Sequence, residues 1–498
     1  MSQISEVGKI RREVLIEISR LIFEGKLEQE IYTILGTVVK EDGPRYRCCV
    51  HKERAVLGER INMALSQPIG TRLEDAAENT MNGKFTVMPI INVLPEACDR
   101  CPIDKFLVTD ACRNCIAHSC ISSCPKNAIM VVQNRAYIDK TKCVECGLCK
   151  RSCQYGAIIE ISRPCERVCE LEAITAGNDR RAVVDYTKCV SCGACMIACP
   201  FGAINEYSQI GELAVLLKAQ KKRIYAMLAP SYSGQFGPKV KSEQVAAGLR
   251  KLGFAETVEV AFAADVVTNA EAKEFVETIM NGQDYMTTSC CPAFVTLAKQ
   301  FPDALSHVST TVSPMIAAGK IIKADEPEAV VVFIGPCVAK KAEAVNNREI
   351  IDFAITFEEL SALFIGAGID LQAGDEVPIV SGASSDGIGF AKAGGVAQAV
   401  KNVLSTNYPG MVLKEHHCDG LANCKSTLTE LAKGTLAANF LEGMACPGGC
   451  VGGPGRLMDA RVTAKMVEQH SAKAAIKSAA ANKAALDEGQ KHFSDNHN

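Results

Sequence analysis

The chain has 498 residues, with 57 acidic and 54 basic side chains and a formal net charge of −3. This balance gives no electrostatic basis for binding nucleic acid or an anionic membrane surface. An uninterrupted apolar run of about 18 residues is absent, and the N-terminus alternates charged with apolar residues. We therefore expect a soluble, cytoplasmic protein of two or three domains, because single cores stop growing beyond roughly 250–300 residues.

Residues 1–95 place apolar side chains at helical spacing among charges, which predicts a mostly helical N-terminal region. This region contains two adjacent cysteines, Cys48 and Cys49, which we interpret as structural or exposed thiols.

Cysteine is the unusual residue of the composition, with 25 in the chain, most of them between Cys98 and Cys199. Because cytosolic thiols are kept reduced, this number indicates metal binding rather than disulfides. Residues 96–207 also repeat a related ending four times, as CPKNAI, CQYGAI, CELEAI and CPFGAI. An internal repeat of this kind predicts several copies of one metal-binding unit.

Two runs have the spacing C-x2-C-x2-C-x3-C, in which three thiolates hold one 4Fe-4S cluster and the fourth binds a neighbouring cluster. Zinc, which also takes C-x2-C pairs, is the alternative. The regular runs are Cys143, Cys146, Cys149, Cys153 and Cys189, Cys192, Cys195, Cys199.

Looser copies of the run precede each regular one, at nearly equal gaps, so we expect two successive two-cluster modules. Crossing the fourth ligand within each module then predicts four ligand sets. They are Cys112, Cys115, Cys120 with Cys153; Cys143, Cys146, Cys149 with Cys124; Cys189, Cys192, Cys195 with Cys169; and Cys165, Cys199 with Cys98, Cys101.

Strand-like segments alternate with helical ones over residues 208–464, the pattern of an α/β domain, and residues 465–498 predict an exposed helical tail. Three loops of this domain carry four further cysteines that can hold one more cubane in a cleft. These are Cys291, Cys337, Cys446 and Cys450.

The segments TSCCPAF, GPCVAKKAEA and EGMACPGGCVGG resemble, in order and spacing, the three signature loops of iron-iron (FeFe) hydrogenases. The resemblance covers roughly residues 96–460. It implies ferredoxin-like 4Fe-4S modules joined to a two-lobed α/β catalytic domain, and an enzyme that reversibly reduces protons to dihydrogen. It also implies a ferredoxin-type electron carrier as partner, and maturation proteins that supply a diiron unit with CO, cyanide and azadithiolate ligands.

The same resemblance assigns roles to individual residues. Cys291, Cys337, Cys446 and Cys450 would bind a 4Fe-4S cluster, with Cys450 bridging to the diiron unit. Because adjacent side chains seldom point at one atom, Cys290 would not be a ligand and would instead pass protons to the azadithiolate amine. A thiol that merely fills space is the alternative.

Glu271 and Glu274 lie three residues apart, on one face of a predicted helix, and with Ser309 they match the proton relay of the family. A solvated helix face is the alternative. Lys340 would bind one cyanide and the turn Ala229, Pro230, Ser231 the other. Met315 and Met444 would also contact the cofactor, Met444 as a soft apolar wall.

The chain departs from the commonest members of the family at several positions, including the GGPGR ending of its last signature loop, and so resembles the branch called group B. Phe294 stands where they have tryptophan, Gly335 where they have methionine, and Met315 where they have glutamine. Cys418 and Cys424, near His416 and His417, match no loop of the family, and we interpret them as structural or surface residues. A dihydrogen sensor and an iron-sulfur scaffold without the diiron unit are the rival functions.

The four-cluster assignment predicts the iron content of residues 96–207. Four cubanes bring about sixteen iron atoms, whereas the two regular runs alone account for about eight. Iron analysis of anaerobically prepared protein measures this number, and about eight irons in this region would contradict the four-cluster assignment.

Overall fold

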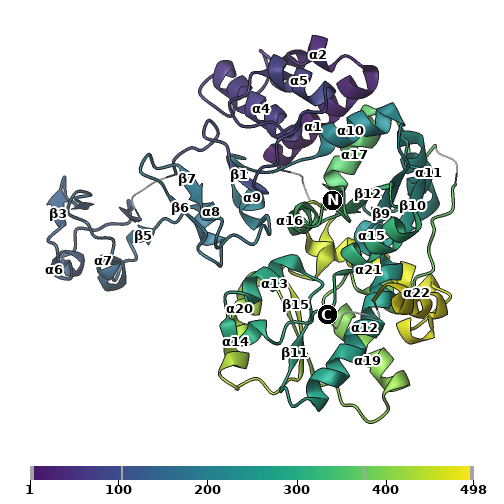
Figure 1. Ribbon diagram of the computed structural model, residues 1–498. Helices are drawn as coiled ribbons and strands as arrows, with labels where there is room; N and C mark the ends of the chain where they lie inside the picture. The colour runs from purple at the N-terminus through teal and green to yellow at the C-terminus, as the bar shows by residue number, and fades with distance from the viewer. Residues whose placement is uncertain (1–4, 102–104, 374–375, 494–498) are drawn as a thin grey trace.

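A computed structural model describes residues 5–101, 105–373 and 376–493 (Figure 1). The N-terminal helices lie over the large C-terminal part of the molecule, and the cysteine-rich segment extends to one side as an arm. The described part of the chain has mixed helices and sheets, which confirms the α/β multidomain class expected from the sequence.

The N-terminal helices pack their apolar faces together and against the C-terminal part. Helix α1 buries the residues that the sequence placed at helical spacing, including Val14, Ile18 and Ile22, and it lies against α17. The close approach depends on Gly366 of α17, where an added Cβ would lie 2.5 Å from the Cβ of Ser19. The N-terminal helices are α1 (Glu6–Glu24), α2 (Leu27–Glu30), α3 (Thr33–Val38), α4 (Val50–Ala64) and α5 (Leu73–Met81).

The arm consists of two units with the same arrangement of strands, each formed by two antiparallel pairs. The basal unit spans residues 90–101 and 163–207. It pairs β1 (Ile91–Val93) with β8 (Ile204–Glu206), and β6 (Ile174–Ala176) with β7 (Ala182–Val184), beside helices α8 (Pro164–Arg167) and α9 (Ala194–Ala198).

The second unit, residues 105–161, is inserted in the first. It pairs β2 (Phe106–Val108) with β5 (Ile158–Glu160), and β3 (Ile129–Val132) with β4 (Arg135–Ile138), beside α6 (Ser119–Ser122) and α7 (Leu148–Ser152). Our expectation of two successive modules was therefore wrong. The first strand of the basal unit precedes the whole inserted unit, and its partner strand follows it.

Two parallel sheets form the centre of the C-terminal part. One has the order β10 (Glu256–Glu259), β9 (Ile224–Leu228), β12 (Val330–Gly335) and β13 (Phe353–Thr356), and the other has β11 (Met286–Thr287), β15 (Phe440–Met444) and β14 (Glu415–Asp419). Strand β12 has the sequence VVVFIG and is buried along its whole length, as expected for a strand covered on both faces.

Helices surround and connect these sheets. They are α10 (Ile210–Ala219), η1 (Pro230–Tyr232), α11 (Ser242–Leu252), α12 (Val260–Met280), α13 (Pro292–Ala298), α14 (Pro302–Leu305), α15 (Pro314–Asp325), α16 (Ala339–Asn346), α17 (Phe357–Gly366), α18 (Ser385–Gly389), α19 (Gly395–Asn407), α20 (Leu421–Ala432) and η2 (Cys450–Gly452).

The C-terminal tail differs from the single exposed helix that we expected. It consists of α21 (Ala460–Lys473), η3 (Ala479–Ala481) and α22 (Lys483–Phe493), and α22 packs on α12. The buried Asn482 fixes this turn, because its amide donates to Asp265 at 2.7 Å and to the carbonyl of Gly382 at 2.6 Å. These partners lie 100 and 217 residues earlier in the sequence, so local pattern did not indicate them.

A buried ion-pair network joins the arm to the C-terminal part. Lys341 of α16 is 1% exposed and lies 3.2 Å from Glu206 of β8 and 2.8 Å from Glu359 of α17. Its ammonium also donates to the carbonyl of Tyr207 at 3.1 Å. Burial raises the pKa of Glu206 to about 7, and the nearby Lys341 opposes that rise. The network therefore requires its single cation.

Replacing that cation should destabilise the protein. Lys341→Met leaves the buried carboxylates of Glu206 and Glu359 without this cation, and removing one side of a buried ion pair costs about 3–5 kcal/mol. We expect a clearly lower thermal melting temperature. The control is Lys9→Met, which removes an exposed ion pair with Glu6 on α1 and should leave melting unchanged. Equal melting temperatures for the two variants would contradict the importance of the network.

Candidate functional site

The loops that follow four of the parallel strands meet in one place between the two sheets. In open α/β sheets, binding sites lie at the carboxyl ends of the strands, where the loops can diverge. Here Ala229 follows β9 and Cys337 follows β12 of one sheet, while Cys290 follows β11 and Cys446 follows β15 of the other. The signature segments, far apart in sequence, are thereby brought together.

Four thiols lie deep in this region: Cys291, Cys337, Cys446 and Cys450. Burial raises the pKa of each, and neighbouring thiols of the group contribute further to the rise at Cys337, Cys446 and Cys450. Without a metal these cysteines would stay protonated, and a bound metal would deprotonate them. A group of buried thiols that raise one another's pKa is suited to bind an iron-sulfur cluster, whose iron atoms take thiolate ligands.

A cavity of about 80 Å³ adjoins the thiols. Its wall is almost entirely apolar, and it includes Met315, Phe390 and Met444. The hydroxyl of Ser231 is wholly buried in this wall and has no hydrogen-bond partner among the described residues. A dry cavity with an unpaired hydroxyl beside four thiols fits a bulky cofactor that carries small polar ligands.

Lys340 also lines the cavity, and its ammonium is held from the protein side. Nζ donates to Ser313 at 2.8 Å and to Glu343 at 2.6 Å. Burial, the largest effect, lowers the pKa of Lys340, but Glu343 and Cys337 outweigh it and the net pKa is raised. The side chain therefore stays charged, and since an ammonium has three donors, one remains for a ligand in the cavity.

Two departures from the commoner family pattern have a packing explanation. At Gly335 an added Cβ would lie 2.7 Å from the ring of Phe333, so the phenyl ring, which lines the cavity, takes the space of a larger side chain. Phe294 is fully buried, and an added Cβ on Gly443 would lie 2.2 Å from its ring. These contacts keep the cavity wall filled with residues different from the family's usual ones.

The predicted proton-relay residues line up between the cavity and the surface. Cys290 lines the cavity, and the carboxyl of Glu271 is close enough to contribute to the raised pKa of its thiol, after burial. The hydroxyl of Ser309 donates to Glu274 at 2.6 Å and also lies near Glu271. Glu274 borders a separate surface pocket of about 100 Å³.

Glu271 is the unusual member of this series. It is fully buried, and neither carboxylate oxygen has a hydrogen bond of good geometry among the described residues. Burial first, then the charge of Glu274, raises its pKa to about 8. A buried carboxyl that holds a proton near neutral pH and can release it is suited to proton transfer.

In the arm, the structure brings together cysteines that match the predicted ligand sets. In the inserted unit, Cys120 lies near Cys112 and Cys153, and Cys149 lies near Cys143 and Cys146. In the basal unit, Cys195 lies near Cys169, Cys189 and Cys192, while Cys101 and Cys165 lie near Cys98 and Cys199.

Backbone amides that point at sulfur show that the two units are structurally equivalent. The amide of Ala136 on β4 donates to Cys112 at 3.4 Å, and the amide of Ala182 on β7 donates to Cys98 at 3.4 Å. Cys98 therefore holds in the basal unit the place of Cys112 in the inserted unit. The sequence hid this equivalence because the inserted unit separates Cys101 from Cys165.

The basal unit contacts the buried thiols between the sheets. The pKa of Cys446 is raised mainly by burial and by the other thiols of the site. Cys192 is near enough to Cys446 to add to this rise. At the adjacent Gly193, an added Cβ would lie 3.0 Å from Pro454, so the turn packs tightly on the C-terminal part. The set around Cys192 is thus the part of the arm that adjoins the site.

The remaining cysteines stand apart from these groups. Cys48 and Cys49 are exposed, with their sulfur atoms 3.8 Å apart. Cys418 and Cys424 are buried in an apolar cluster, with their sulfur atoms 3.3 Å apart. Among the described residues, no three His, Cys, Asp or Glu side chains are arranged to hold a single metal ion.

Sequence reasoning missed several residues of the site. Phe390 and Phe333 line the cavity without any motif to mark them. Glu442 is fully buried near Cys290, where it accepts from the amides of Gly394 and Ala397, each at 2.8 Å, at the start of α19. A glutamate inside the apolar segment FLEGM was the only available signal for it.

Comparison with known proteins agrees with this site. Residues 222–454 match the family model for the iron-only hydrogenase large subunit, C-terminal domain, and residues 136–159 and 182–205 match that for a 4Fe-4S binding domain. The periplasmic [Fe] hydrogenase large subunit of Nitratidesulfovibrio vulgaris is 29% identical over 64% of this chain and 85% of its own length. The chain is thus similar to FeFe hydrogenases in the segment that carries the buried thiols.

Iron hydrogenase 1 of Clostridium pasteurianum is 28% identical to this protein over 67% of each chain. The human nuclear prelamin A recognition factor is also similar, at 25% identity over 46% of this chain and 62% of its own. Overall sequence similarity therefore extends to proteins that are not named hydrogenases, and the residues of the site distinguish between functions better than overall identity does. No helix of the described segments is long and apolar enough to span a membrane.

The raised pKa of Glu271 predicts how stability depends on pH. The folded protein holds a proton on this carboxyl up to about pH 8, whereas the unfolded chain releases it near 4.5. The free energy of unfolding should therefore fall as pH rises from about 4.5 to 8. In Glu271→Gln this fall should be shallower. Melting temperatures measured across the window check it, with exposed Glu468→Gln as a control of unchanged slope; equal slopes in Glu271→Gln and the wild type would contradict the prediction.

Proposed function

We propose that this protein catalyses the reversible reduction of protons to dihydrogen. The observation that carries the proposal is the position of Cys290, a buried thiol that lines the same apolar cavity as Cys291, Cys337 and Cys450. A cubane without a diiron unit would need neither this thiol nor Lys340 at the cavity wall. When bound, the 4Fe-4S clusters and the diiron unit would supply the electrons and the chemistry at dihydrogen.

The ligands of the active-site cluster would be Cys291, Cys337, Cys446 and Cys450. Lys340, held by Ser313 and Glu343, would direct its remaining donor at one polar ligand of the diiron unit. The unpaired hydroxyl of Ser231, after the neighbouring parallel strand β9, would serve a second such ligand. Met315, Met444 and the phenylalanine rings would exclude water, which strengthens each of these interactions.

Protons would move between the surface and the cavity by way of Glu274, Ser309, Glu271 and Cys290. Each neighbouring pair in this order is supported by a hydrogen bond or by electrostatic proximity. The Cys290 thiol rests protonated, because burial raises its pKa well above the ordinary value. The thiol would pass its proton to the azadithiolate amine of a diiron unit bound in the cavity. It would then recover a proton from Glu271, because a pKa of about 8 keeps that carboxyl protonated near neutral pH.

Electrons would pass along the arm through four 4Fe-4S clusters. The inserted unit lies farthest from the sheets and includes the exposed Cys146, so it would receive electrons first (Figure 1). The basal unit would follow, and the cluster of Cys169, Cys189, Cys192 and Cys195 would be last, beside Cys446. Proximities within each unit support the four ligand sets, apart from Cys115 and Cys124, whose assignment rests on the sequence spacing.

A ferredoxin or similar small carrier is the proposed partner at the inserted unit, and maturation proteins would deliver the diiron unit. The exposed thiol Cys146 and the projecting position of the unit support a docking site for a carrier. We also propose a cytoplasmic location, because thiolate ligands need a reducing compartment. Cell fractionation checks this, since the relative from Nitratidesulfovibrio vulgaris is described as periplasmic.

The decisive assay is dihydrogen evolution from a reduced viologen dye, with protein prepared without oxygen and loaded with the diiron cofactor. We expect evolution by the wild type and a loss of about a hundredfold or more in Cys290→Ala, the usual scale for removing a positioned proton donor. The control is Cys418→Ala, which removes a buried thiol that does not line the cavity. It should keep most of the activity.

Other outcomes would favour the rival functions. Full cofactor uptake without evolution would contradict the enzyme and favour a dihydrogen sensor. Failure to take up the diiron cofactor, with all iron-sulfur clusters present, would favour a scaffold. Equal activity of Cys290→Ala and the wild type would leave the enzyme intact and overturn the proton-donor role.

A further inference from the structure

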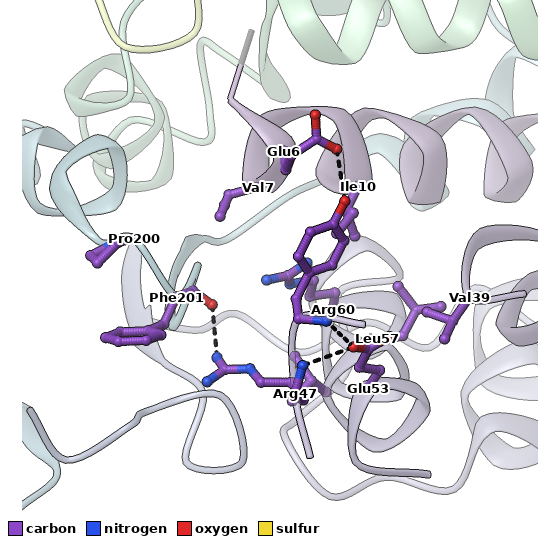
Figure 2. Close-up of a pocket in the computed structure, with 12 residues that line it drawn as sticks. Glu6, Val7, Ile10, Val39, Arg47, Glu53, Leu57, Arg60, Pro200 and Phe201 are labelled. Carbon is purple, nitrogen blue, oxygen red and sulfur yellow. Dashed lines mark hydrogen bonds between the residues drawn. The ribbon is translucent and has the colours of Figure 1, made fainter. Parts of the chain in front are cut away.

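One accessory ligand set lies against the N-terminal helices. Beside the set Cys98, Cys101, Cys165 and Cys199 lies a cavity of about 120 Å³, formed between the N-terminal helices and the turn Pro200–Phe201 (Figure 2). Arg60 of α4 lines this cavity and donates from Nη2 to the carbonyl of Gly202 at 3.1 Å. Gly202 follows Cys199 by three residues, so a guanidinium from another part of the chain stands at this ligand set.

Arg60 carries a buried charge that lacks a carboxylate partner. It is 8% exposed, no acidic side chain of the described residues forms an ion pair with it, and its Nε has no hydrogen-bond partner there. Glu53, in the same cavity, instead accepts from the backbone amides of Tyr46 and Arg47 (Figure 2). Isolated buried charges are costly, and the pKa of Arg60 is lowered to about 10, by burial and then by Arg11 and Arg47. Cys199 is the group whose negative charge opposes this lowering.

Two more arginines approach the same set. The guanidinium of Arg47 donates to the carbonyl of Ala97 at 2.8 Å. It also donates to the carbonyl of Phe201 at 3.1 Å (Figure 2). Arg163 is buried two residues before Cys165, close enough to Cys101 to lower its pKa in part. Arg47 is paired with Asp99 at 3.4 Å and Arg163 with Glu166 at 3.4 Å, so Arg60 is the arginine of this group without a carboxylate partner among the described residues.

The inserted unit provides an internal comparison. Its turn at Gly156 is equivalent to the turn at Gly202, with φ of +61° and +59°. An added Cβ on Gly202 would lie 2.4 Å from Nη2 of Arg60, whereas one on Gly156 would meet nothing within 4 Å. The same turn is thus open to solvent in one unit and closed by a guanidinium in the other.

We propose that Arg60 sets the reduction potential of the cluster bound by Cys98, Cys101, Cys165 and Cys199, and makes it the accessory cluster that is easiest to reduce. Reduction adds one negative charge to a cluster, and a buried cation nearby favours the reduced form. Arg60 acts through charge and touches no substrate, so it is a positioning residue. The inference rests on the four-cluster chain of the proposed function, and it gives the N-terminal helices a role in electron transfer.

The test is a redox titration followed by electron paramagnetic resonance, on full-length protein that carries its 4Fe-4S clusters without the diiron unit. In Arg60→Gln, one cluster should become harder to reduce, with the reduced-to-oxidised ratio at fixed potential falling on the order of tenfold, equivalent to 59 mV for one electron. Arg60→Lys keeps the positive charge, so the midpoint potential of this cluster should stay close to that of the wild type. Arg54→Gln, on the same helix and bonded to the carbonyl of Val39, should shift nothing.

The outcomes separate this inference from the proposed function. Four accessory clusters by iron analysis, with no midpoint moved in Arg60→Gln, would overturn the inference alone. An equal shift of every cluster would overturn it as well. Fewer than four accessory clusters in the wild type would overturn both. If Arg60→Gln does not fold, as judged by thermal melting, Arg163→Gln should lower the same midpoint from the opposite side, and an unchanged midpoint there would overturn the inference.

Discussion

The burial of four thiols between the carboxyl ends of two parallel sheets is the constraint on which the rest of the structure depends. Thiols so deeply buried stay protonated unless a metal takes the proton's place, so their placement fits a metal cluster and little else. Strand β12 is buried along its whole length, so the loop that follows it and carries Cys337 begins inside the protein and not at its surface. The cavity beside the thiols has an almost wholly apolar wall, which these loops and the neighbouring helices provide.

Charged groups inside the protein fall into two kinds, and the difference shows what each does. Lys341 has carboxylate partners at 3.2 and 2.8 Å, so its charge is satisfied and it joins the arm to the sheets. Glu271 and Arg60 are buried with unsatisfied atoms. Unsatisfied buried groups are costly, and each of these lies beside a site where charge would move: a proton at Cys290, an electron at the Cys199 set. Paired groups hold the architecture, and unpaired ones adjoin the chemistry.

The insertion of one iron-sulfur unit into another is possible because both units begin and end on one antiparallel strand pair. In the inserted unit, the amide of Ile161 donates to Lys105 at 2.7 Å, so entry and exit are adjacent. In the basal unit, the amide of Tyr207 donates to Ile90 in the same way. A unit whose ends meet can interrupt another without distorting it. The result is an arm with one unit against the sheets and one projecting away.

The sequence by itself determined the local chemistry of this protein: the thiol spacings, the three signature loops, and the parallel strands that position them. These features can be predicted from the sequence because the spacing of cluster ligands and the hydrophobicity of a strand each depend on only a few consecutive residues. Only the tertiary structure decided how the two cluster units are joined. The cysteine spacings predicted the four ligand sets, but they gave no sign that one unit is inserted in the other, because the antiparallel pairing of β1 with β8 acts across more than one hundred residues.

The same distance hid Arg60, Phe333 and Glu442, whose importance lies in what other segments place beside them. It also hid the partner of α22, which the sequence left exposed. Packing and electrostatics depend on neighbours in space, and a single sequence records neighbours along the chain.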